Sequence, residues 1–144
     1  MILIDTSVWS LALRRRRGDL SRAEARHVQE WRRLVREGQA VLIGPIRQEL
    51  LSGVRDEQAW ERLRHALRPF PDLPLATADY ERAAQFFNRC RARGVTGSSV
   101  DLLICSASAR YDAPVYTTDT DFIRYVPILE LQLHKPHPET KGAG

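Results

Sequence analysis

The chain of 144 residues has few cysteines, few lysines and no long apolar segment, and each shortage excludes a class of protein. Two cysteines, Cys90 and Cys105, are too few for the disulfide framework of a small secreted domain. No apolar run approaches the roughly 20 residues that cross a membrane. A basic leader followed by a long apolar segment, as in a secretory signal, is also missing. We therefore expect a cytoplasmic protein with reduced cysteines.

The lysine shortage makes the basic charge almost entirely arginine. Lys135 and Lys141 are the only lysines, so twenty of the 22 basic residues are arginines, and the net charge is +4. A guanidinium group binds phosphate through paired hydrogen bonds, although a solvated surface or a high-GC genome would give the same bias. The positive field is consistent with a polyanionic partner such as nucleic acid.

Short apolar runs alternate with helical periodicity along the chain, which predicts an α/β fold: a central parallel sheet with helices on both faces. We expect about five strands, the clearest at 2–4, 40–43, 115–117 and 128–133. Helix starts are marked by a capping box at Ser21, by Pro45, and by Asp56, Thr77 and Ser98. The length suits one domain, at 1–133, followed by a flexible tail at 134–144.

Acidic side chains recur where the predicted strands end. They are Asp5 after 2–4, Glu49 in the helix after 40–43, Asp101 in the helix capped by Ser98, and Asp119 and Asp121 after 115–117. Asp5 and Asp101 can each be explained as helix-capping residues. However, parallel strands end at one edge of a sheet, where open α/β folds bind their ligands. We therefore expect these acids to converge there.

Converging carboxylates repel one another and favour protonation unless a cation lies among them. Oxygen ligands without histidine or cysteine suit Mg²⁺ or Mn²⁺, and such an ion activates water for phosphodiester hydrolysis. The basic surface would hold the nucleic-acid backbone. Four successive arginines follow the first predicted helix: Arg14, Arg15, Arg16 and Arg17. Four adjacent side chains would wrap round a helix, so they cannot all lie on one face. They are either a solvated helix end or a contact to phosphate or to a partner.

Taken together, these motifs resemble the PIN-domain ribonucleases, and among them the VapC-type toxins of bacterial toxin–antitoxin pairs. The resemblance covers residues 1–133. It rests on Ile4-Asp5-Thr6-Ser7, on Glu49, on Asp101 at the start of its helix, and on Thr117-Thr118-Asp119-x-Asp121-Phe122.

The resemblance implies a PIN-like fold and a metal-dependent endoribonuclease. In this reading Asp5, Glu49, Asp101 and Asp119 are the catalytic, metal-binding acids. Thr6 and Thr118 match polar positions flanking the site, and Asp121 matches a supporting or additional acid. It also implies an RNA substrate, a homodimer, and a small VapB-like antitoxin that covers the acidic cleft.

Three other functions remain open from the sequence. A phospho-acceptor also gathers acids at strand ends, but it needs a lysine there, and neither Lys135 nor Lys141 is so placed. The acids could be structural, in a module that binds nucleic acid or a partner without catalysis. A PIN-domain nuclease could also act in RNA processing rather than as a toxin. The RNA target and the number of metal ions are not determined by the sequence.

Overall fold

Three parallel strands form the sheet of residues 1–138, which the computed structural model describes apart from the side chain of Arg17. β1 (Ile2–Ile4) lies between β2 (Ala40–Val41) and β3 (Val115–Tyr116). Leu3 pairs with Val41 on one side and with Val115 on the other. All three residues of β1 are buried, which explains why this strand is an unbroken apolar run.

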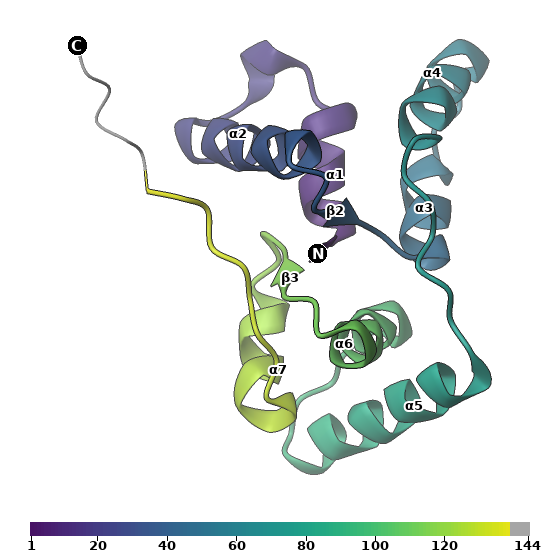
Figure 1. The fold of residues 1–144 in the computed structure, drawn as a ribbon, viewed down its shortest axis with the longest axis vertical. Helices are drawn as coiled ribbons and strands as arrows, with labels where there is room; N and C mark the ends of the chain where they lie inside the picture. The colour runs from purple at the N-terminus through teal and green to yellow at the C-terminus, as the bar shows by residue number, and fades with distance from the viewer. Residues whose placement is uncertain (139–144) are drawn as a thin grey trace.

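Seven α-helices surround the sheet within the described residues. They are α1 (Thr6–Leu13), α2 (Arg22–Arg36), α3 (Gly44–Leu51), α4 (Glu57–Leu67), α5 (Thr77–Ala92), α6 (Ser99–Tyr111) and α7 (Asp121–Leu129). A short 3-10 helix, Arg17–Asp19, links α1 to α2. Figure 1 shows α1 and α2 on one side of the strands and α5, α6 and α7 on the other. The predicted α/β fold is thus confirmed. None of these helices combines the length and the apolar character needed to span a membrane.

The predicted number of strands, about five, is wrong: the described residues form three. The expected strand at 128–133 begins inside α7, and only Leu133 makes an isolated parallel bridge, to Val115. Phe122 and Tyr125 are fully buried at helical spacing, and this periodicity outweighs the alternation of leucines that follows it. A second isolated bridge, Leu42 to Asp72, lies at the other edge of the sheet.

Most of the predicted helix starts are confirmed. The capping box at Ser21 and the caps at Asp56 and Ser98 are present, and Pro45 lies in the first turn of α3. The exception is α5, which has Ala76 rather than Thr77 at its N-cap. The Ala76 N–H is instead bound by the side chain of Asp79, at 2.7 Å.

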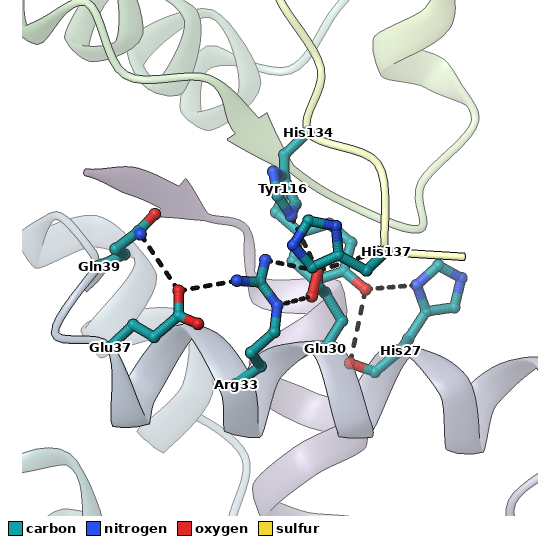
Figure 2. A network of polar contacts seen from close by, with 8 residues as sticks. All are labelled: His27, Glu30, Arg33, Glu37, Gln39, Tyr116, His134 and His137. Atoms are coloured by element: carbon teal, nitrogen blue, oxygen red, sulfur yellow. Dashed lines mark hydrogen bonds and ion pairs between the residues drawn. The ribbon is translucent and has the colours of Figure 1, made fainter. Parts of the chain in front are cut away.

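The chain beyond β3 returns to α2 and is held there by a buried carboxylate, Glu30, whose side chain is 3% exposed. Arg33 donates two hydrogen bonds to this carboxylate, at 2.6 and 3.0 Å. The His134 Nε2 atom lies 3.1 Å from Glu30 Oε2, and the His137 N–H donates to the same oxygen at 3.3 Å (Figure 2).

A backbone hydrogen bond connects this segment to the sheet as well, since the His134 N–H donates to the Val115 carbonyl at 2.8 Å. Residues 134–138 of the expected flexible tail therefore contact both α2 and β3. The remainder of that tail, 139–144, lies outside the described residues.

The environment of Glu30 shifts its pKa strongly. Burial raises this pKa, but the hydrogen bonds from Arg33, His134 and the His137 N–H, together with the charge of Arg33, outweigh burial. The net result lowers the pKa of Glu30 from 4.5 to about 2. A lowered pKa in the folded state means that ionised Glu30 stabilises the fold above pH 4.5, and that this contribution is lost as the pH falls toward 2.

We expect Glu30→Gln to lower the free energy of unfolding at pH 7 by about 1–3 kcal/mol, because a buried charge-assisted network loses its anion. The difference from wild type should shrink as the pH falls from 4.5 to about 2, where wild-type Glu30 also becomes protonated. Urea denaturation over a pH series measures both effects.

The matched control is Glu61→Gln, which removes an exposed ion pair with Arg64 and should change stability little. A Glu30→Gln deficit of constant size from pH 7 to pH 2 would contradict the role given to the ionised carboxylate.

Candidate metal centre

Asp5 stands at the end of β1, where it caps α1, and is 6% exposed. Its Oδ1 atom accepts a hydrogen bond from the Thr6 N–H at 2.7 Å. Its Oδ2 atom accepts from the Ser7 hydroxyl at 2.9 Å and from the Thr117 hydroxyl at 2.7 Å. Burial raises the pKa of Asp5, while these hydrogen bonds oppose the increase. The carboxylate is therefore fixed in one orientation by donors from the first turn of α1 and from the residue that follows β3.

Three further acids meet beside it, from two parts of the chain that are distant in sequence. Asp101 lies in the first turn of α6, Asp119 follows β3, and Asp121 is the first residue of α7. Each offers a carboxylate oxygen that lies within 4.8 Å of the other two. Asp119 Oδ1 accepts the Asp121 N–H at 2.9 Å, so the turn after β3 holds these two acids together. We call Asp101, Asp119 and Asp121 the acidic triad.

The pKa of Asp101 is raised by its surroundings. Burial raises its pKa, as do the negative charges of Asp5 and Asp119, against hydrogen bonds from Tyr125 and Ser98 that lower it. The Tyr125 hydroxyl donates to Asp101 Oδ2 at 2.8 Å. The charge of Asp5 acts on Asp101, which is consistent with a buried acid beside the triad.

Glu49 lies farther from this group than the sequence suggests. It is exposed on α3, and its Oε2 atom accepts a hydrogen bond from the Thr6 hydroxyl at 3.0 Å. Among the described residues, neither Asp5 nor Glu49 belongs to a set of three acids with oxygens within 4.8 Å. The structure thus gathers Asp101, Asp119 and Asp121 tightly, with Asp5 adjacent and Glu49 connected through Thr6.

The remaining predicted site residues are distributed around the triad. The Thr118 N–H donates to Ser7 at 3.0 Å, and Thr118 lines a hollow between α1 and α2 together with Arg15. Arg15 pairs with Glu24 at 3.5 Å. Of the other arginines of the run, Arg14 lines a different hollow, against α4, and Arg16 is exposed. The side chain of Arg17 lies outside the described part of the chain.

Sequence reasoning missed the roles of Tyr125, Thr117 and Ser7 as hydrogen-bond donors to site acids. Tyr125 was missed because a strand was expected at 128–133, and the helix α7, which carries Tyr125, was therefore not predicted. The helical spacing of Phe122, Tyr125 and Leu129 was the signal that could have found it.

The donor set fits a hard divalent cation. The triad offers carboxylate oxygens alone, with no histidine or cysteine among its ligand atoms. Such donors suit Mg²⁺ or Mn²⁺, and a cation would remove the repulsion that raises the pKa of Asp101. The residues present therefore match the metal that the sequence predicts.

The sequence model of the family described as PIN domain matches residues 2–126. The chain belongs to the PIN-domain family. Its relatives include the VapC ribonuclease Mb1587 of Mycobacterium bovis and ribonuclease VapC11 of Mycobacterium tuberculosis. Each is 33% identical over 136 residues, which cover 92% of this chain and 96% of the relative.

Solved structures share the fold of this PIN domain. FitAcB from Neisseria gonorrhoeae matches with a TM-score of 0.73 and 22% identity, over 94% of this chain and 98% of that one. VapBC2 from Rickettsia felis, bound to a DNA fragment from its promoter, matches with a TM-score of 0.69 and 16% identity, over 93% and 98%.

We expect Mg²⁺ to raise the thermal unfolding midpoint of this PIN domain, since a ligand at one hundred times its Kd stabilises by about 2.7 kcal/mol. Asp101→Asn should abolish this increase. It should also raise the midpoint of the metal-free protein at pH 7, because a carboxyl group whose pKa is raised by folding destabilises the fold once ionised.

Thermal unfolding with EDTA and with Mg²⁺ measures both effects, and Asp56→Asn, at the cap of α4, serves as control because Asn caps as well as Asp. An equal Mg²⁺ effect in wild type and Asp101→Asn would place the metal elsewhere.

Proposed function

We propose that the chain is a metal-dependent endoribonuclease that hydrolyses RNA phosphodiester bonds. The observation that carries this proposal is the acidic triad beside the buried Asp5. Three carboxylate oxygens, one from α6 and two from the turn that leads into α7, lie within 4.8 Å of one another. The names of the VapC ribonucleases, at 33% identity over nearly the whole chain, support RNA as the substrate.

In this proposal Asp101, Asp119 and Asp121 hold Mg²⁺ or Mn²⁺, with Asp5 close enough to contribute. When bound, the ion supplies Lewis-acid chemistry, because it lowers the pKa of water and neutralises charge on the phosphate. Tyr125 orients Asp101 through its hydroxyl, and Thr117 and Ser7 fix Asp5. These hydrogen bonds come from the protein's own side chains, which orient the acids for the ion.

Glu49 and the two threonines have separate roles in the proposal. Glu49 is exposed and stands across Thr6 from Asp5, where it can accept a proton or complete the ligand set from α3. Thr6 holds Glu49 by its hydroxyl, and Thr118 continues the polar rim toward α2.

We further propose that the protein is the toxin of a toxin–antitoxin pair, that it acts in the cytoplasm as a homodimer, and that a small VapB-like antitoxin restrains it. The support is the similarity to VapC ribonucleases and the shared fold with VapBC2 and FitAcB. The acidic cleft is the surface that such a partner would cover.

We expect Asp119→Asn to fold normally and to lose RNA cleavage by about a hundredfold or more, since one ligand of the ion becomes a neutral amide. Gel assays on total cellular RNA, with Mg²⁺ and with EDTA, measure the cleavage. Asp56→Asn is the matched control and should cleave as wild type does.

Full cleavage by Asp119→Asn, or cleavage by wild type that persists in EDTA, would contradict the proposal. Cleavage by wild type of the RNA but not of DNA would support RNA as the substrate.

A further inference from the structure

One face of α2 carries a row of long polar side chains, mostly arginine. Its members are spaced four or three residues apart, which puts them on one side of the helix: Arg22, Arg26, Gln29, Arg33 and Arg36. Arg32 lies beside the row. All of these side chains except Arg33 are exposed.

The acids near this row are already engaged. Glu30 is bound by Arg33, and Glu37 is bound by the same guanidinium at 2.7 Å, so the charge of Arg33 is neutralised. In contrast, Arg32 and Arg36 form no hydrogen bond or ion pair with any residue of 1–138. Their positive charges are thus available to a ligand.

The C-terminal segment turns this face into a groove. Pro136, His137 and Pro138 stand opposite the arginines Arg26, Arg32 and Arg36, and together they line a hollow of about 420 Å³. Figure 2 shows how the segment is held over α2, with the buried Glu30 between the Arg33 guanidinium and the His137 backbone. The groove is preformed, because both of its walls are fixed to the same carboxylate.

A second hollow, between α1 and α2, is lined in part by Ser7, which donates a hydrogen bond to Asp5. That hollow is lined by His27 from α2 and by Ser7 and Thr118, which neighbour the site acids in sequence. Arg26, which lines the groove, directly precedes His27 in α2. The two hollows therefore share helix α2 as a common wall.

We propose that this α2 groove binds the phosphate backbone of an RNA strand outside the cleavage position. This rests on the proposed function, because it assigns part of the same substrate to a second surface. Guanidinium groups bind phosphates in a bidentate manner, and an arginine row of repeated spacing suits a repeating anion. Protein interfaces are also enriched in tyrosine and tryptophan, and the groove lining contains neither.

The test measures RNA binding in EDTA, where binding is separated from cleavage. The full chain is titrated into a fluorescein-labelled single-stranded RNA of mixed sequence, longer than the roughly 16 nucleotides that one binding site covers at most. Fluorescence anisotropy at several salt concentrations gives Kd and its salt dependence.

The double variant Arg32→Gln, Arg36→Gln removes the two unpaired charges of the groove. We expect it to weaken RNA binding by about tenfold and to reduce the slope of log Kd against log salt by about 1.4, or about 0.7 for each lost phosphate contact. The matched control, Arg91→Gln, Arg93→Gln, removes the same charge from the exposed end of α5 and should bind as wild type does.

Thermal unfolding of both double variants checks that the fold is retained. Wild-type affinity in Arg32→Gln, Arg36→Gln would overturn the proposal, as would an equal loss in the α5 control. Competition by a poly-glutamate peptide as strong as that by unlabelled RNA would also overturn it, because the groove would then suit an acidic protein segment.

These outcomes are separate from the test of catalysis. If wild type binds RNA through the groove but cleaves none with Mg²⁺, the proposed nuclease activity fails and the groove stands. If it cleaves RNA but the groove variant binds normally, only the groove assignment fails.

Discussion

Repulsion among carboxylates at one edge of a small parallel sheet is the constraint on which this structure depends. Asp5, Asp101 and Asp119 are brought near each other by β1, α6 and β3. Burial raises the pKa of Asp101, and the negative charges of Asp5 and Asp119 add to that increase. Hydrogen bonds from Tyr125, Ser7 and Thr117 hold the acids in place in spite of that cost. An arrangement that lowers stability without a cation is understandable if its purpose is to bind one.

The charges elsewhere in the molecule follow a complementary pattern. The acidic triad and Asp5 gather negative charge at the sheet edge, while α2 presents arginines to solvent. Within α2, the buried Glu30 attaches the C-terminal segment to the helix. That segment also bonds to β3, the strand that leads to Asp119. The same short strand thus connects the candidate metal centre with the wall of the α2 groove.

Much of the site could be predicted because it depends on local sequence. An apolar run followed directly by an acid predicted that Asp5 lies at the end of a strand. A serine three residues before Asp101 predicted the start of α6. What local patterns could not give was the distance between acids. Asp121 lies within the triad and Glu49 does not, a difference set by how α3 and α7 pack on the sheet.

The two wrong predictions about the fold, the strand at 128–133 and the cap of α5, also arose because local patterns do not reveal tertiary packing. The sequence around 128–133 fits both the alternation of a strand and the spacing of a helix. Burial of Phe122 and Tyr125 favours the helix. In α5, the aromatic Tyr80 is 54% exposed, whereas the adjacent Asp79 is buried. Asp79 is ion-paired with Arg82 and with the distant Arg110, a partner that no short stretch of sequence reveals.

The most direct measurement is anomalous diffraction from crystals of the full chain soaked in Mn²⁺. The account predicts a manganese peak within about 2.5 Å of carboxylate oxygens of Asp101, Asp119 and Asp121, and none in crystals of Asp119→Asn. A peak at another place, or well-ordered triad side chains with no peak at saturating Mn²⁺, would contradict it.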